Sequence, residues 1–372
     1  MFWYLILCIL ISYPLLIVYA GVRWRKSAQT VALQLSCFVL WFFMAMRAPS
    51  VGVDTKYYCY IFEQLGQVPF SKVFRAVTYA SPNGNWTMDF EPGYRFYNKL
   101  VSLISHDPQM ITIMNSTVII LLLYKLIRKQ SENAMLSIWL YITLGVFQTE
   151  MNVARNAIAI LIIYLALQYV ENGKKLAYAL SVCLAALIHQ STLLFLPLYF
   201  FLRKPAPSSK NMRGLILFSA FIGTGILIFG ARLQAIFPGI FGKYLTAQNM
   251  KMESILVGAL YLVLVIFVLR FMKKEEKNRI IRECSIGIWM FTFTMSCFGL
   301  NIGLKMAARV AALFGTYMII LIPNMVSKIS EEKRRHTLIV LLIAGCGIQY
   351  ILRLMVNNIG GTMPYSFFWQ EL

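Results

Sequence analysis

Arginines near the predicted ends of apolar segments are the side chains best suited to chemistry in this sequence. A guanidinium group keeps its positive charge and grips phosphate through two parallel hydrogen bonds. A single such arginine can also be a side chain that snorkels to the membrane interface. Five arginines at one face of the membrane instead predict a binding site for an anionic headgroup. They are Arg47, Arg95, Arg155, Arg309 and Arg353.

Arg155 is the strongest of these candidates because it lies in the first turn of a predicted helix over 153–170. The free backbone N–H groups and the positive end of the helix dipole act in the same direction as its charge. This combination suits a pyrophosphate. A structural ion pair between Arg155 and the nearby Glu150 is the alternative interpretation.

Two carboxylates and one histidine could act on a sugar hydroxyl. Asp54 and Glu91 each precede a predicted helix, so each could simply satisfy backbone N–H groups there, or act as a general base if it faces a cavity. Of the three histidines, only His189 lies in an apolar context. A lone buried histidine is usually structural, but a neutral imidazole can also accept a proton from an alcohol near pH 7.

Metal-binding spacings are absent from the sequence: there is no acidic pair spaced to hold a divalent ion and no zinc-ligand pattern. It also contains no phosphate loop. We therefore expect no metal and no other cofactor, with chemistry that depends on the positioning of groups.

The elements that must position these residues are membrane helices. Hydrophobic residues make up 59% of the 372 positions and charged residues only 13%, which is too apolar for a soluble protein of this length. Apolar runs recur along the chain, so we predict an all-α, polytopic integral membrane protein with a single domain over 1–372. About twelve segments are predicted: 1–20, 30–46, 109–127, 134–150, 153–170, the broken pair 176–188 and 191–202, then 213–230, 254–271, 284–300, 310–326 and 337–352.

The net charge of +20 comes from short basic clusters between apolar runs, which argues against a nucleic-acid partner. Placing both termini outside puts every dense basic cluster in the cytoplasm, in agreement with the positive-inside rule. The five arginines above then lie at the outer face.

The longest outer link, 47–105, contains two amphipathic stretches of the kind that lie flat in a membrane interface. A loop of this kind, packed over a helix bundle, is a favoured place for function. The apolar faces at helical spacing are Tyr57, Tyr58, Ile61, Phe62 and Leu65 in the first stretch, and Tyr94, Tyr97, Leu100, Val101 and Ile104 in the second.

The run between Lys175 and Arg203 is too short for two full spans. Each half reaches roughly 20 Å at ~1.5 Å per residue, against a ~30 Å hydrocarbon core. The chain should turn at 188–192, below the outer surface, where polar backbone is tolerated only against protein or a watery cavity. We therefore predict a cavity lined by His189.

Several individually loose motifs follow one another along nearly the whole chain. They are Arg47 with segment 51–55 and Tyr58, segment 90–94, Asn152 with Arg155 and Asn156, segment 188–191, Arg309, and Pro364 with Tyr365. Taken in this order, they resemble the EpsG family of Wzy-type exopolysaccharide and capsule polymerases, in which glutamine more often stands at the position of Asn156. The resemblance implies a GT-C-like membrane enzyme.

The resemblance implies a metal-independent glycosyltransferase of the bacterial inner membrane. It would join undecaprenyl-pyrophosphate-linked repeat units at the outer face, with the bilayer and other polysaccharide-assembly proteins as further partners. On this interpretation His189 or Asp54 is the base and Glu91 positions the sugar. The pyrophosphate-binding residues would be Arg47, Arg155, Arg309 and Asn152.

Two other functions remain open from the sequence. A flippase for lipid-linked oligosaccharides also needs cationic residues, although a transporter should carry charges along its whole pathway. A membrane acyltransferase that modifies the polysaccharide would need access to a cytoplasmic acyl donor, and the sequence places no buried histidine on that side.

Overall fold

The computed structural model describes residues 2–19, 26–75, 78–80, 87–196, 199–200, 232, 316–327, 329, 331–356 and 358–371. The chain forms two compact units, Met1–Tyr199 with Val326–Leu372, and Phe200–Met325. The first unit carries the candidate site and is the one described below. The predicted segments 213–230, 254–271 and 284–300 lie outside the described residues, as does Arg309, and the single membrane domain stays a prediction.

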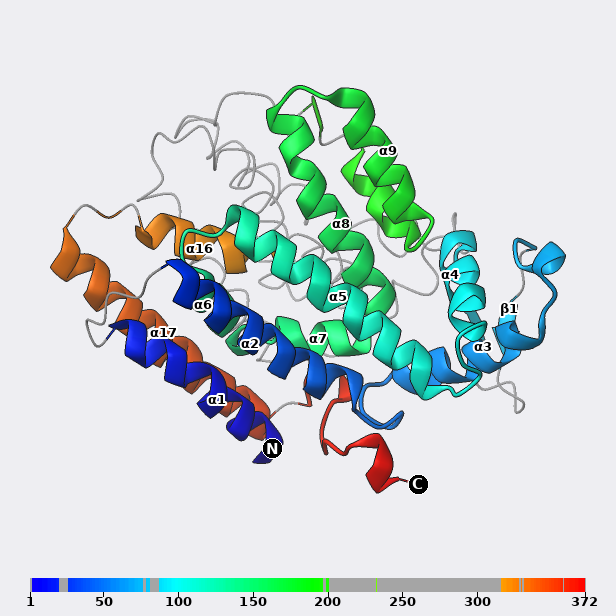
Figure 1. Cartoon of the computed structure of the whole chain (residues 1–372), viewed down its shortest axis with the longest axis horizontal. Coiled ribbons are helices and arrows are strands. Elements are labelled where there is room, and N and C mark those ends of the chain that lie inside the picture. The colour runs from blue at the N-terminus through cyan, green and yellow to red at the C-terminus, as the bar shows by residue number, and fades with distance from the viewer. Residues whose placement is uncertain are drawn as a thin grey trace. The chain divides into compact units, whose positions relative to one another are not determined.

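The regular elements of the described residues are helices except for one short antiparallel hairpin, so the all-α prediction is confirmed for them (Figure 1). The hairpin pairs β1 (Thr78–Ala80) with β2 (Thr87–Asp89). The α-helices outside the long link are α1 (Phe2–Tyr19), α2 (Lys26–Ala45), α5 (Gln109–Gln130), α6 (Ala134–Thr143), α7 (Val146–Asn152), α8 (Ala154–Glu171), α9 (Lys175–Ala186), α16 (Met318–Ser327) and α17 (Glu332–Val356). Most of α16 belongs to the second unit.

Four described helical stretches are long and apolar enough to cross a membrane: Ala28–Ala45, Gln109–Gln130, Ala154–Glu171 and Glu332–Met355. These stretches support a multi-pass membrane protein, while the total of about twelve spans stays a prediction. The predicted segment 134–150 is divided, because Gly145 adopts a positive φ of 77° and separates α6 from α7. A left-handed glycine of this kind is a common way to end a helix.

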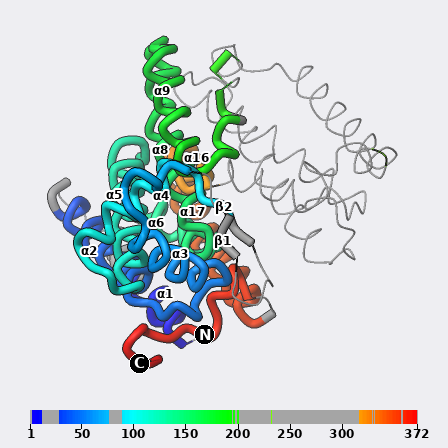
Figure 2. Tube along the Cα trace, turned by 90° about the vertical axis from the view of Figure 1, so that its right-hand side faces the viewer, coloured from blue at the N-terminus to red at the C-terminus, as the bar shows by residue number. Residues whose placement is uncertain are grey.

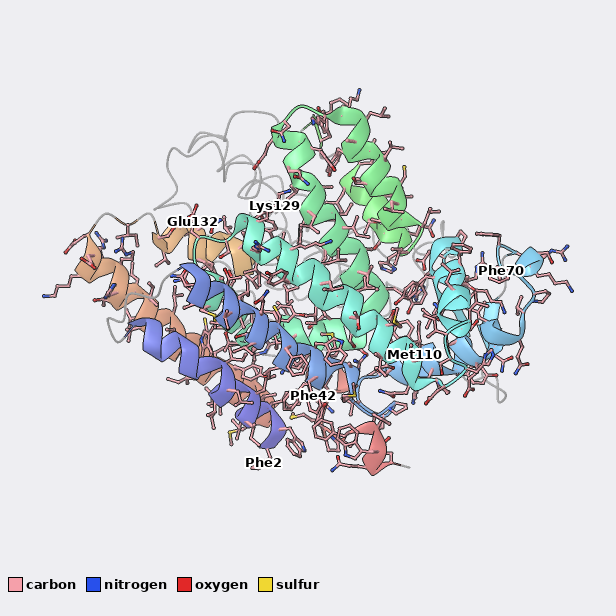
Figure 3. The ribbon with its side chains drawn as sticks, viewed as in Figure 1. Phe2, Phe42, Phe70, Met110, Lys129 and Glu132 are labelled. Atoms are coloured by element: carbon pink, nitrogen blue, oxygen red, sulfur yellow. The ribbon has the colours of Figure 1, made fainter. Side chains whose placement is uncertain are left out.

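The core of the first unit is a set of helices around α5 and α8. Helix α5 packs against α2 and α8, and α9 packs against α8 (Figure 1 and Figure 2). Met110 and Lys129 mark the two ends of α5 (Figure 3). The loops that carry the candidate site meet the end with Met110, whereas the basic residues Arg128 and Lys129 occupy the other end.

The two amphipathic stretches of the long link form helices, α3 (Thr55–Gln67) and α4 (Pro92–Ser102), joined through the short 3-10 helix η1 (Phe70–Lys72) and the hairpin. Helix α3 buries the predicted face, including Tyr58, Ile61 and Phe62. Helix α4 divides the predicted apolar face, because it buries Tyr94 and Val101 but exposes Leu100. That either helix lies flat in a membrane interface stays a prediction.

Both termini of the first unit lie at the same end as these loops (Figure 1). The hydroxyl of Tyr4 donates to the carbonyl of Thr362 at 3.0 Å, and Arg47 pairs with Phe367 through a backbone bridge. The C-terminal segment 358–371, with the short helices η3 (Ile359–Gly361) and η4 (Phe368–Gln370), therefore closes over the loop that follows α2. The orientation of this end relative to a membrane stays a prediction.

Candidate functional site

The carboxylate of Glu91 lies at the centre of the candidate site. Pro92 begins α4, and Glu91 precedes it in extended backbone (φ −63°, ψ 150°) without capping its own helix. Its side chain instead joins two other elements. Oε2 accepts a hydrogen bond from Nη1 of Arg155 at 2.6 Å, and Oε1 accepts one from the backbone N–H of Gln190 at 3.0 Å.

Arg155 occupies the first turn of α8, as the sequence predicts. Nη1 also donates to the carbonyl of Asp89 at 2.9 Å, and the guanidinium lies 4.5 Å from the centre of the Phe90 ring and 5.9 Å from those of Tyr58 and Tyr94. Aromatic faces stabilise a cation at such distances. Its Nε has no hydrogen-bond partner within the described part of the chain. The side chain is thus held in place with a donor left over.

His189 lies where α9 gives way to the 3-10 helix η2 (Gln190–Phe195). This break confirms the turn predicted at 188–192. Helix α9 has only 12 residues, or about 18 Å at ~1.5 Å per residue. Nδ1 of His189 is 3.3 Å from Oε1 of Glu91, and the imidazole is the most exposed of the three side chains, at 29% against 16% for Glu91 and 12% for Arg155.

The ionisation of Glu91 is set by its neighbours. Burial disfavours the carboxylate, but His189, the charge of Arg155 and the N–H of Gln190 together favour it more strongly, and the pKa of Glu91 is lowered from 4.5 to about 2. A carboxylate with so low a pKa is a poor proton acceptor near neutral pH. Glu91 is better suited to orient its two partners, Arg155 and His189.

A close backbone contact explains why the start of α4 meets the end of α9. The N–H of Tyr94 donates to the carbonyl of Leu187 at 3.1 Å. A Cβ atom on Gly93 would lie 2.7 Å from the Cβ and 2.8 Å from the carbonyl oxygen of Leu187. Only glycine permits this approach without a shift of one of the two segments. The contact places Glu91 beside His189.

Asp54 and Asn152 lie next to this group. Asp54 occupies the N-cap position of α3, but its side chain makes no capping hydrogen bond there. Its backbone N–H donates to Oδ1 of Asn152 at 2.9 Å. Tyr58, one turn along α3, has its ring beside Arg155. Asn152 thus fixes the loop that presents Asp54, and a direct contact of Asn152 with pyrophosphate stays a prediction.

Arg47 does not point toward an opening. Its side chain is 2% exposed, Nη2 donates to the carbonyl of Met151 at 2.8 Å, and Nη1 donates to the carbonyl of Met44. Burial also lowers its pKa. These bonds join the end of α2 to α7, because buried carbonyl groups need donors. The geometry supports a structural role and gives no support to the predicted contact between Arg47 and pyrophosphate.

Two other arginines of the predicted set also bind backbone carbonyls. Arg95 donates to Phe74 at 3.1 Å, and Arg353 donates to Leu144 at 3.3 Å. Of the members that the structure describes, Arg155 is the one that joins Glu91 and His189.

The alternative ion pair between Glu150 and Arg155 is wrong. Oε2 of Glu150 accepts a hydrogen bond from the hydroxyl of Tyr141 at 2.6 Å, whereas the carboxylate partner of Arg155 is Glu91. Chain proximity suggested the first pairing. The contacts of the start of α4 with Leu187 and Arg155 decided the second.

Sequence reasoning missed the part played by Gly93 and by the aromatic rings around Arg155. The available signal was the order of segment 90–94, in which an aromatic residue stands on each side of the acid, proline and glycine. That pattern indicates a helix start with a close backbone neighbour. It does not identify the neighbour.

Comparison with known proteins gives one match. The model of the EpsG family matches residues 30–367. The searches of curated proteins and of solved structures give no match.

Proposed function

The chain belongs to the EpsG family, and on this premise we propose that it is a membrane-embedded polymerase of lipid-linked sugar repeat units. A growing glycan leaves its undecaprenyl pyrophosphate and is joined to a sugar hydroxyl on the next lipid-linked unit, at the outer face of a bacterial inner membrane. The product is a capsular polysaccharide or exopolysaccharide. The donor carries its own leaving group, so no nucleotide takes part.

The observation that carries this proposal is the meeting of Arg155, Glu91 and His189 at one point of the fold. They come from three separate elements, the start of α8, the start of α4 and the break after α9. A fixed cation, a permanent anion and a partly exposed imidazole are the groups that a metal-free glycosyl transfer needs. Arg155, whose side chain is 12% exposed, offers its guanidinium charge to a diphosphate oxygen.

In the proposed step, the acceptor hydroxyl oxygen forms a bond to the anomeric carbon of the donor sugar. The bond from that carbon to the diphosphate oxygen breaks, and the lipid diphosphate leaves with the electron pair. The hydroxyl proton passes to Nε2 of His189. Arg155 stabilises the charge that develops on the leaving group, which is commonly the largest catalytic contribution.

Glu91 serves both partners in this mechanism. Because its carboxylate faces Nδ1 of His189, it favours the tautomer with the proton on Nδ1 and leaves Nε2 as the acceptor. It then stabilises the imidazolium that forms when His189 takes the proton, as the acid of a catalytic triad does. Glu91 is thus a positioning residue, a more specific role than the sugar contact expected from sequence.

Asp54 is the competing candidate for the base. It lies one helical turn from Tyr58, whose ring contacts Arg155, so it is near the same cation from the side of α3. In favour of His189, its Nδ1 lies 3.3 Å from Oε1 of Glu91. The exchange of Asp54 for asparagine separates the two candidates, since a loss of activity as large as that of His189→Ala would move the role of base to Asp54.

The test of the proposal is polymer length in cells that carry Arg155→Ala, with the protein present at its normal level. Arg128→Ala is the matched control, because Arg128 is an exposed arginine at the other end of the helix bundle, beside Tyr124. We expect short or single repeat units with Arg155→Ala and full-length polymer with Arg128→Ala. Full-length polymer with Arg155→Ala would remove Arg155 from the mechanism. Transfer of lipid-linked units across liposomes without lengthening would indicate a flippase instead.

A further inference from the structure

Helix α4 exposes an apolar surface that is not needed to hold the candidate site together. With the turn that precedes the hairpin it presents large apolar side chains outward, of which Ile104 is 66% and Phe74 59% exposed. The rings of Phe74 and Phe96 stack with centroids 5.7 Å apart. We name this surface the α4 plate; Phe70, one of its residues, is labelled in Figure 3. Its residues are Phe70, Phe74, Phe96, Leu100, Leu103 and Ile104.

Polar side chains lock the plate in this orientation. Nη2 of Arg95 donates to the carbonyl of Phe74 at 3.1 Å, and Nζ of Lys99 donates to the carbonyl of Gly66 at 2.7 Å. Both cations lie on the buried side of α4. A helix that buries charged residues and exposes its leucines is inverted relative to a helix in water. Such an arrangement fits a hydrocarbon environment.

The neighbouring helix α3 has the opposite character. Its outward residues are polar, including Lys56, Glu63, Gln64 and Gln67, and its apolar residues are buried. The two helices pack against each other. One side of the loop therefore suits water and the sugar chain, and the other suits lipid.

The plate is continuous with the candidate site along the chain and along the helix. Glu91 immediately precedes α4, and Phe96 lies on the second turn of that helix. The 11 residues of α4 extend about 16 Å at ~1.5 Å per residue. A molecule whose diphosphate contacts Arg155 thus has an apolar track of this length leading away from its headgroup.

We propose that the α4 plate holds the hydrocarbon chain of the lipid-linked diphosphate, while the sugar chain lies toward α3. This inference rests on the proposed function, since it assumes that a lipid diphosphate binds at Arg155. The plate then favours carriers with a long hydrocarbon chain. A long chain is bound along α4, whereas a chain of two isoprene units ends before it reaches Leu100.

The experiment compares two probes on the full-length protein in nanodiscs, undecaprenyl diphosphate and geranyl diphosphate, with dissociation constants measured for wild type, Leu100→Ser/Leu103→Ser and Arg155→Ala. We expect wild type to bind the long probe at least tenfold more tightly than the short one. In Leu100→Ser/Leu103→Ser the affinity for the long probe falls to that of the short probe, which is unchanged because the short chain ends before Leu100. Arg155→Ala weakens both.

The outcomes separate the two proposals. If wild type binds neither probe, the proposed function fails. If wild type binds both probes equally, or if the double variant weakens both to the same extent, the plate contacts bulk membrane lipid and the inference is overturned. A photoreactive residue at position 100 gives a second measurement that tolerates poor folding of the double variant. This residue should crosslink to undecaprenyl diphosphate. The same photoreactive residue at position 64, on the solvent-exposed side of α3, should not. Equal labelling at both positions also overturns the inference.

Discussion

Oε2 of Glu91 lies 2.6 Å from Nη1 of Arg155, although the two residues are 64 positions apart in the chain. Oε1 of the same carboxylate faces His189 at 3.3 Å. One acid therefore links the group proposed to bind diphosphate with the group proposed to take the proton. The predictions below separate this linking role from a purely structural one.

We predict that Glu91→Gln lowers the rate of polymer formation by ~100-fold or more, the range typical for loss of acid–base function. Glutamine nearly preserves the shape of the side chain but removes the charge that stabilises a protonated His189. The rate is measured in membranes that contain equal amounts of each protein. Glu63→Gln, at an exposed position of α3, is the control, and an unchanged rate in Glu91→Gln would contradict the linking role.

The low pKa of Glu91 predicts a pH-dependent contribution to stability. The pKa is lowered from 4.5 to about 2 in the folded protein, so the ionised carboxylate stabilises the fold above pH 4.5. This contribution is lost as the pH falls from 4.5 toward 2, because the unfolded chain takes up the proton first. The difference in Tm between wild type and Glu91→Gln should be largest near neutral pH and should shrink on acidification. A difference that is constant with pH would show that the charge of Glu91 does not contribute.

Gly93→Ala should separate the start of α4 from the end of α9. The added Cβ would meet Leu187 at 2.7 Å, and overpacking of this kind costs about 1–3 kcal/mol. We expect a strong loss of polymerisation with the protein still folded, measured as polymer per amount of membrane-inserted protein. Gly345→Ala is the matched control, since a Cβ there has no neighbour within 4 Å. Normal activity in Gly93→Ala would show that the site does not depend on this contact.

Arg47→Met should behave as a stability variant. The change leaves the carbonyl groups of Met44 and Met151 without this donor, and each unpaired buried group costs about 1–3 kcal/mol. The Tm should fall, while the rate per folded molecule stays near that of wild type. Arg155→Ala should also lower the Tm, because Glu91 and the Asp89 carbonyl lose a donor, but here the rate per folded molecule should be lost as well, and this rate separates the two variants. An inactive but fully stable Arg47→Met protein would restore the pyrophosphate contact expected from the sequence.

The sequence by itself determined most helices of the described part, including α3, α4 and the break after α9, but not the division of 134–150 into α6 and α7. Apolar periodicity, together with proline and glycine at helix ends, acts over a few neighbouring residues and is legible without a fold. The short distance between Lys175 and Arg203 placed His189 at a break for the same reason, since chain length limits what a segment can span. The sequence also indicated that Arg155 lies at the start of its helix.

The tertiary structure decided which groups meet. Arg155 could have paired with Glu150 in the preceding helix, but Glu150 bonds to Tyr141 and Glu91 reaches Arg155 from a distant loop. Arg47 turned inward because buried carbonyl groups required its donors. Helix α4 exposes Phe96 and Leu100, while Arg95 and Lys99 bind backbone carbonyls on its buried side. Such choices depend on which buried polar groups need a partner, and only the packing of segments far apart in the chain determines that.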